Sequence, residues 1–409
     1  MTPDDPLAAP TFDGEGLGTL LAHDPPGIYG AVVPPIVQTS LFTFPSYAEM
    51  EARFHGRSSR HIYSRGDNPT VQAFEEKIRV LEGGEAARAV SSGMAAIACA
   101  VLANVEAGDR IVCVRDVYPD AFRLFRLLLT RFGVRVDFVD GGDPAAIEAA
   151  APGAKLIYLE NPTSLTFRTQ DLAAMVAIAR RHGLVSVIDN SWATPVFQRP
   201  LAHGVDIVVH SASKYISGHS DTIAGVIVTS AAHMARIMTL TYPVLGPKLA
   251  PFEGWLLLRG LRTLDLRMRR HQASTATIVE RLRASPHVEA VHWPGPDGCG
   301  TLTGASGLFG VTLAAHVDIA RFCDALRLFR LGISWGGHES LAFPARIGLT
   351  IPNAPANSLV EFGVPDRLVR LNVGLEEADD LWADLDQALA QAATGPARSE
   401  ARTKEGELQ

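Results

Sequence analysis

Lys214 is the residue whose surroundings most clearly indicate chemistry. It follows Ser211 and Ser213 in the stretch SASKYISGHSDTIAG, which comes directly after the apolar run VDIVVH. Lysine side chains normally end in solvent, so an amine at the buried end of a predicted strand needs a functional reason. Asp189 ends a similar run, LVSVID, and would lie at a neighbouring strand end. The two could form a buried ion pair, but the hydroxyls around the lysine favour a ligand site.

A phosphate group fits the stretch SSGMAA, which predicts the start of a helix. The backbone N–H groups of Gly93 and Met94 would point out of that helix end, and Ser211 and Ser213 would add hydroxyl donors. The lysine could bind an aldehyde, and the aspartate could pair with a ring nitrogen. Pyridoxal phosphate carries all three groups, and an aspartate at its ring nitrogen keeps the ring able to accept electrons.

The elements that must position these residues alternate along the chain. Strand-like apolar runs include RIVCVRD, KLIYLENP, LVSVIDN and VDIVVHS, and helical patterns such as DLAAMVAIARRHG separate several of them. Apolar strands that follow helices predict an α/β fold with a mostly parallel sheet covered on both faces. In such sheets the ligand crevice lies at the carboxyl ends of the strands. That rule selects Tyr118, Asn161 and Asp189 together with residues 211–214.

Composition and pattern divide the chain into four segments. Residues 1–60 are rich in proline and glycine, and they predict an arm that has little core of its own and contacts a neighbouring subunit. Residues 61–260 predict the cofactor-binding domain, and residues 261–393 predict a smaller C-terminal α/β domain. The polar residues 394–409 predict a frayed tail. One long helix, WLLLRGLRTLDLRMRRHQASTATIVERLRAS, is expected to lead from the first domain into the second.

Composition excludes several other classes of protein. The 409 residues carry a formal net charge of -7, with 47% hydrophobic and 20% charged residues, which is typical of a globular domain. The basic residues are scattered, so neither nucleic-acid nor membrane binding is expected. Four cysteines without a CxxC pair indicate no disulfide framework and no thiolate metal site. The first residues do not follow a signal-peptide pattern, and we expect a cytoplasmic protein without a metal.

Several ordered motifs carry a family resemblance. Besides SxSKYxxGHSDxxxG and IDNSWATP they are YSRGDNPT, LEGGEAARAVSSGMAA, IYLENPTS, LRGLRTLDLRM, SWGGHESL and VRLNVGLEEADDLWADL. In this order they resemble the pyridoxal-phosphate enzymes of cysteine and methionine metabolism, the trans-sulfuration or cystathionine γ-synthase-like group, over residues 28–393. The resemblance implies fold type I, the aspartate-aminotransferase type, with a large cofactor-binding domain and a smaller C-terminal domain.

The resemblance also implies a role for each matching residue. Lys214 would bind the cofactor and move the Cα proton of the substrate, Asp189 would pair with the ring nitrogen, and Tyr118 would stack on the ring and assist catalysis. Arg370 would grip the substrate carboxylate with two parallel hydrogen bonds, which lysine cannot reproduce. The other implied contacts are to the phosphate from Gly93, Met94, Ser211 and Ser213, to the phosphate from Tyr63 and Arg65 of a neighbouring subunit, and to the substrate from Ser334, Trp335 and Tyr118.

Two residues indicate which bond breaks. Trp335 in SWGG is typical of the bacterial cystathionine β-lyase branch, where γ-type relatives more commonly carry leucine, and Ser164 stands where γ-type members often have asparagine. We therefore expect carbon–sulfur β-elimination, from L-cystathionine to homocysteine, pyruvate and ammonia, or from a related cysteine S-conjugate. Ile333 and His338 replace tyrosines of those β-lyases, which leaves the preferred substrate open.

Other interpretations stay open beside this one. The chain could act at the γ-carbon, as a cystathionine γ-lyase, a γ-synthase or a homoserine-ester sulfhydrylase. It could also be a regulator that binds pyridoxal phosphate without turnover, although the intact catalytic set disfavours this. The resemblance implies a homotetramer built from two catalytic dimers, in which the N-terminal arm contacts a neighbour.

Overall fold

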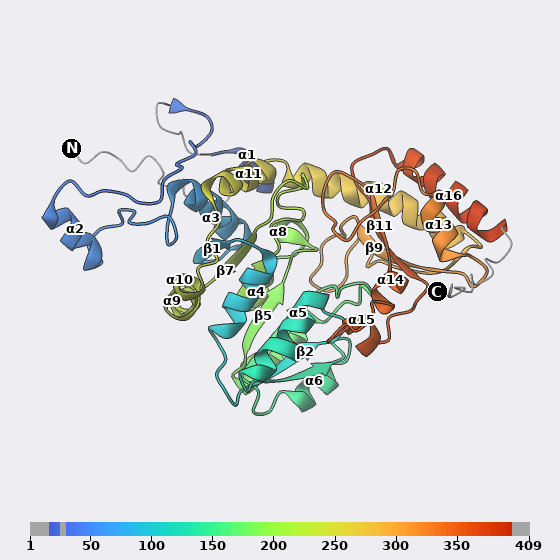
Figure 1. The fold of residues 1–409 in the computed structure, drawn as a ribbon, viewed down its shortest axis with the longest axis horizontal. Helices are drawn as coiled ribbons and strands as arrows, with labels where there is room; N and C mark the ends of the chain where they lie inside the picture. The colour runs from blue at the N-terminus through green and yellow to red at the C-terminus, as the bar shows by residue number, and fades with distance from the viewer. Residues whose placement is uncertain (1–15, 25–29, 395–409) are drawn as a thin grey trace, which may run out of the picture.

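The computed structural model describes residues 16–24 and 30–394. Parts of the predicted arm (1–15 and 25–29) and the tail from residue 395 lie outside the described residues. The described residues form a seven-stranded and a five-stranded sheet, which are joined by the long helix α12, Leu264–Ala284 (Figure 1). The predicted α/β class, with one larger and one smaller α/β unit, is confirmed.

The larger sheet has the strand order β1-β7-β6-β5-β4-β2-β3. Strands β3, β2, β4, β5 and β6 pair in parallel, whereas β7 runs antiparallel to both β6 and β1. Every residue of β4, β6 and β7 is buried, as expected for strands covered on both faces. The strands are β1 Ala86–Val90, β2 Arg110–Val114, β3 Arg135–Val139, β4 Leu156–Glu160, β5 Val185–Asp189, β6 Ile207–His210 and β7 Gly225–Thr229.

Helices with clear capping signals cover this sheet. α4 begins after Ser92, whose Oγ accepts a hydrogen bond from the Ala95 backbone N–H at 3.1 Å, and it packs on β5, β6, β7 and β1. α3 ends at Gly83 in the left-handed conformation and packs on β1 and β7. The helices of this part are α3 Pro69–Glu82, α4 Gly93–Leu102, α5 Pro119–Arg123, the π-helical turn Leu124–Leu129, α6 Pro144–Ala150, α7 Leu172–His182, α8 Thr194–Phe197, the 3-10 turn Pro200–His203, α9 Ala231–Leu240, α10 Tyr242–Leu245 and α11 Pro251–Leu261.

The smaller sheet has the order β10-β11-β12-β9-β8 and is antiparallel except for the β10–β11 pair. Helices α13 and α16 pack against each other, and α16 also contacts α12 (Figure 1). The elements of this part are β8 Val288–His292, β9 Leu308–Leu313, α13 Ile319–Ala325, β10 Arg330–Leu331, β11 Leu341–Pro344, α14 Ala345–Leu349, α15 Ser358–Glu361, β12 Leu368–Asn372 and α16 Ala378–Thr394.

The expectation of one long helix from residue 255 onward is wrong. α11 ends at Leu261 and α12 begins at Leu264, so the helix is broken at this point. Arg267 explains the break, because its buried guanidinium donates to the carbonyl oxygens of Tyr215 at 2.7 Å and Gly260 at 2.8 Å. The Gly260 carbonyl at the end of α11 is therefore tied to α12 and to the loop that carries Lys214.

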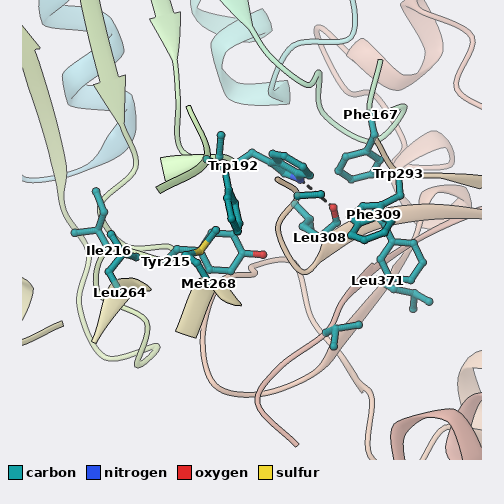
Figure 2. Close-up of a cluster of buried hydrophobic side chains, with 14 of the residues drawn as sticks. Phe167, Trp192, Tyr215, Ile216, Leu264, Met268, Trp293, Leu308, Phe309 and Leu371 are labelled. Carbon is teal, nitrogen blue, oxygen red and sulfur yellow. Dashed lines mark hydrogen bonds between the residues drawn. The ribbon is translucent and has the colours of Figure 1, made fainter. Parts of the chain in front are cut away.

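A hydrophobic core joins the two sheets (Figure 2). Trp192 follows β5, and its indole Nε1–H donates to the carbonyl oxygen of Leu308 in β9 at 2.9 Å. Tyr215, the residue after Lys214, is fully buried in the same cluster, with its ring centroid 5.5 Å from that of Trp335 and 5.1 Å from that of His271. The junction between the sheets therefore holds the backbone next to Lys214.

The described residues of the predicted arm form one segment that is packed into the core and one that is exposed. α1, Leu17–Ala22, packs Leu20 and Leu21 into the core against α3 and α12. The chain from residue 30 to α2, Tyr47–Phe54, extends away from the body (Figure 1) and has large exposed apolar side chains, among them Val32, Tyr47 and Phe54.

Candidate active site

Asp189 and Ser211 meet at the carboxyl ends of the parallel strands β5 and β6. Asp189 is the last residue of β5, and its Oδ1 accepts hydrogen bonds from the Ser191 N–H at 2.9 Å and from the Ser191 hydroxyl at 2.5 Å. The same Ser191 oxygen accepts from the backbone N–H of Ser211 at 2.6 Å. Burial raises the pKa of the Asp189 carboxyl, while Ser191, His210 and Lys214 act to lower it.

Lys214 lies in the turn that follows β6, beside the loop before β11. Its Nζ donates to the Ser334 hydroxyl at 2.8 Å and lies 5.4 Å from the centroid of the Trp335 ring. Burial, followed by the nearby positive charge of Arg370, lowers the pKa of Lys214 to about 8. The amine is therefore much more often neutral near physiological pH than a solvated lysine would be.

A tight backbone approach joins the helix start to the lysine loop. A Cβ atom on Gly93 would lie 2.7 Å from the Cβ and 2.9 Å from the Oγ of Ser211, so only glycine fits there. Gly93 and Met94 are the first two residues of α4, where backbone N–H groups lack acceptors within the helix. Ser213 lies in the same loop, but its hydroxyl donates to the Ala224 carbonyl at 3.1 Å and accepts from the Ala224 N–H at 2.9 Å. The structure thus brings Gly93, Met94 and Ser211 together as a cradle for an anion.

Arg370 comes from the middle of β12 and reaches the same region from the smaller sheet. Its Nη2 donates to the carbonyl oxygens of Ile333 at 2.7 Å and Ser334 at 3.3 Å, and its guanidinium lies 5.2 Å from the Phe343 ring centroid. Burial lowers the pKa of Arg370 to about 10, which still leaves it charged at neutral pH. The guanidinium keeps further donors for a carboxylate.

Tyr118 precedes α5, and its backbone N–H donates to the Glu160 Oε2 at 2.8 Å. Its hydroxyl donates to the Asp120 carboxylate at 3.1 Å. Burial and the negative charges of Asp120 and Asp189 raise the pKa of Tyr118 to about 12, so the phenol is protonated at neutral pH. Tyr118 can therefore act as a proton donor but not readily as a base.

Tyr63 and Arg65 lie after the arm of residues 1–60, in the segment that leads to α3. The Arg65 guanidinium lies 5.6 Å from the Tyr63 ring centroid and donates to the carbonyl oxygen of Pro243 in α10 at 3.1 Å. Tyr63 is exposed. Within one chain these contacts leave the two side chains on the outer surface, and their assignment to a neighbour's phosphate stays a prediction.

The sequence interpretation missed two residues of this site. Ser191 links Asp189 to the Ser211 backbone, and the signal was its place two residues after Asp189 in IDNS. Glu160 ends β4 and is the register partner of Asp189 across the sheet. Burial, followed by the charge of Asp189, raises the pKa of Glu160 to about 8. The acidic residue that ends the apolar run KLIYLE was the signal for it.

The strand-end rule selected Asn161, which directly follows β4. Its Oδ1 accepts from the Gln170 backbone N–H at 3.0 Å, while its buried Nδ2 has no hydrogen-bond partner among the described residues, so its place in the site stays a prediction. His219 contacts the Ser217 carbonyl oxygen through Nδ1 at 2.6 Å. Ile333 is 81% exposed, and His338 is exposed beside Glu339.

The residues present fit pyridoxal phosphate on grounds of their own chemistry. The glycine approach at Gly93 and the helix end suit a phosphate, and Asp189 suits a pyridinium nitrogen. An amine with a lowered pKa suits the aldehyde. In the described ranges, 16–24 and 30–394, no cluster of three or more His, Cys, Asp or Glu side chains could hold a metal ion, and no helix is long and apolar enough to cross a membrane.

Comparison with known proteins agrees with this chemistry. Residues 19–390 match the family model described as Cys/Met metabolism PLP-dependent enzyme. L-methionine γ-lyase of Pseudomonas putida is 40% identical over 382 residues, which cover 91% of this chain and 96% of that protein. A cystathionine β-lyase of Lactococcus lactis subsp. cremoris is 37% identical over 368 residues, which cover 88% of this chain and 94% of that protein.

The fold has relatives among solved structures as well. Cystathionine γ-lyase from Lactobacillus plantarum, in complex with L-serine, superposes with a TM-score of 0.84 at 37% identity and covers 92% of this chain and 99% of its own. Fold and site therefore define an enzyme of the pyridoxal-phosphate-dependent class. The chain belongs to the family of Cys/Met metabolism PLP-dependent enzymes, as the motifs predicted, and pyridoxal phosphate is its cofactor.

Proposed function

We propose that this enzyme is a carbon–sulfur β-lyase that cleaves L-cystathionine, or a related cysteine S-conjugate, to a thiol, pyruvate and ammonia. The observation that carries the proposal is the position of Trp335, whose ring lies 5.4 Å from the Lys214 Nζ while Ser334 binds the same amine. β-Elimination needs the base to remove a proton from Cα alone, and an amine held by Ser334 beside the Trp335 ring suits removal at that one position. γ-Elimination needs the base to reach a proton on Cβ as well.

The chain's own residues would divide the work as follows. Bound pyridoxal phosphate supplies an electron sink for the pair left when the Cα–H bond breaks. Arg370 binds the substrate carboxylate and thereby orients Cα–H toward the Lys214 Nζ, which takes the proton. The Cβ–S bond then breaks and a Cα=Cβ double bond forms, with the proton for the departing thiolate coming from Lys214 or Tyr118. Water hydrolyses the unsaturated amine to pyruvate and ammonia.

The products of L-cystathionine test this proposal directly. The β-lyase reaction gives pyruvate and homocysteine, a precursor of methionine, whereas γ-cleavage gives 2-oxobutanoate and cysteine. Lys214→Ala, which removes both the cofactor attachment and the base, should abolish either product. Turnover at the wild-type rate by Lys214→Ala would refute the mechanism, and 2-oxobutanoate as the main product would refute the β-lyase assignment.

One specific observation favours a γ-lyase as the second candidate. Ile333 is aliphatic and 81% exposed on the segment that carries Ser334 and Trp335, so it offers no polar group to a charged distal end of a substrate. Relatives at 40% identity include the L-methionine γ-lyase named above. L-methionine as substrate separates the two, because γ-cleavage yields 2-oxobutanoate and methanethiol and a β-lyase yields neither.

We further propose that the enzyme works as a homotetramer of two catalytic dimers in the cytoplasm. The extended arm supports assembly, since Val32 and Tyr47 are more than 80% exposed and need a covering surface. All four cysteines are unpaired, in keeping with a reducing compartment. The solution mass tests the tetramer.

A mixed oligomer tests the shared site. Lys214→Ala and Arg65→Ala chains, each inactive alone, should regain activity when coexpressed, because one of the two sites then has an intact Lys214 and an intact Arg65. Failure to regain activity in a mass-verified mixed dimer would refute the shared phosphate site.

A further inference from the structure

A buried carboxylate ties together the two strand ends that carry Asp189 and Ser211. Glu82 is the last residue of α3 and is 1% exposed. Its Oε1 accepts a hydrogen bond from the Asn190 Nδ2 at 2.9 Å and lies 2.6 Å from the His210 Nε2. Asn190 and His210 are equally inaccessible, at 0% and 1%.

These two partners are chain neighbours of the site residues. Asn190 directly follows Asp189 at the end of β5, and His210 directly precedes Ser211 at the end of β6. Consecutive side chains of extended backbone point to opposite sides of a sheet. Asp189 accordingly lies on the side of Lys214, whereas Asn190 and His210 contact α3 on the other side.

A second link joins the same two strand ends on the site side. The Ser191 hydroxyl donates to Asp189 and accepts from the Ser211 N–H, at 2.5 and 2.6 Å. The two strand ends are therefore linked twice, by Ser191 on the side of Lys214 and by Glu82 on the side of α3. Burying a carboxylate costs free energy that an apolar residue at the end of a helix would avoid, and hydrogen bonds of this kind are what offset it.

We propose that Glu82 is a positioning residue, whose carboxylate fixes the spacing between the Asp189 and Ser211 strand ends and so sets how the enzyme holds its cofactor ring relative to its phosphate. The proposal rests on the assignment of Asp189 to the ring nitrogen and of Ser211 to the phosphate. It does not depend on whether the enzyme cleaves at the β- or the γ-carbon.

Asp206 provides a matched control, because it ties the same two strands at their opposite ends. It precedes β6, and its Oδ2 accepts from the Ser186 N–H at 2.8 Å and from the Ser186 hydroxyl at 2.7 Å in β5. Glu82→Ala and Asp206→Ala therefore each remove a carboxylate that links β5 to β6, the first beside the cofactor and the second at the amino ends of the strands.

The test measures pyridoxal phosphate affinity and the circular dichroism band of the bound cofactor in the full-length enzyme, with the melting temperature recorded beside them. Glu82→Ala should weaken affinity about tenfold and change the cofactor band, as loss of a charge-assisted hydrogen bond implies. Glu82→Gln should stay within about threefold of wild type, because its amide oxygen can still accept from both partners. Asp206→Ala should lower the melting temperature but leave the affinity and the band unchanged.

Two results would overturn the positioning role. One is a Glu82→Ala enzyme with wild-type pyridoxal phosphate affinity and an unchanged cofactor band. The other is an Asp206→Ala enzyme that loses as much affinity as Glu82→Ala when the two variants have the same melting temperature. If Glu82→Ala does not fold, Asn190→Ser removes one link, and unchanged affinity there counts against the proposal in the same way. Wild-type affinity in Ser211→Ala and Asp189→Asn would instead overturn the site assignment, whatever Glu82 does.

Discussion

Replacing Gly93 with alanine should weaken pyridoxal phosphate binding with little effect on global stability. The added Cβ would lie 2.7 Å from the Cβ, 2.9 Å from the Cα and 2.9 Å from the Oγ of Ser211. Carbon atoms pack best at about 3.5–4.0 Å, so the start of α4 and the Ser211 loop must separate by roughly 1 Å. The helix end and the serine would then no longer converge on one phosphate.

The magnitude follows from the cost of overpacking. Inserting a methyl group into a tight contact typically costs about 1–3 kcal/mol. Cofactor binding restores the native spacing, so most of this cost should appear in the binding free energy. With about 1.4 kcal/mol for each factor of ten, the dissociation constant should rise roughly five- to a hundredfold.

The assay is a titration of pyridoxal phosphate onto cofactor-free enzyme, followed by the visible absorption of the bound form. Gly18→Ala is the matched control, because a Cβ there meets nothing within 4 Å and the residue lies within the helix α1. The control should bind within about twofold of wild type. Equal affinity in Gly93→Ala would refute the phosphate cradle at this position.

Three further predictions concern the lysine, the arginine and the serine of the site. The rate at which cofactor-free enzyme captures pyridoxal phosphate should rise with pH and level off above about 8, because only the neutral Lys214 amine attacks the aldehyde. A rate that continues to rise up to about pH 10.4 would show a lysine with an unperturbed pKa. Arg370→Lys should raise KM for amino-acid substrates by about tenfold or more with a smaller effect on kcat, and steady-state kinetics showing an unchanged KM would contradict its carboxylate role. Ser191→Ala should raise the pKa of Asp189 and weaken cofactor affinity about tenfold, measured as above, since a hydrogen bond to a carboxylate is lost. Unchanged affinity would show that this link to Ser211 does not matter.

Much of the fold follows from local sequence patterns. The mostly apolar runs of β4 and β6 and the glycine after α3 indicate their elements without tertiary information. The break between α11 and α12 does not follow from a local pattern, because it depends on hydrogen bonds from the buried Arg267 to carbonyl groups distant in the chain. The spacing of apolar residues along a helix gives no information about such a contact.

The site divides in the same way. The sequence by itself determined the residue types that we propose for the chemistry, because a motif gives the identity and order of its residues. They are Lys214, Asp189, Gly93 and Arg370. Only the tertiary structure decided which side chains contact these residues. The Ser334 hydroxyl accepts a hydrogen bond from the Lys214 amine, and Glu160 is paired with Asp189 on the neighbouring strand. The pKa values of these groups depend on burial and on charges brought close by folding, and sequence distance carries no information about either.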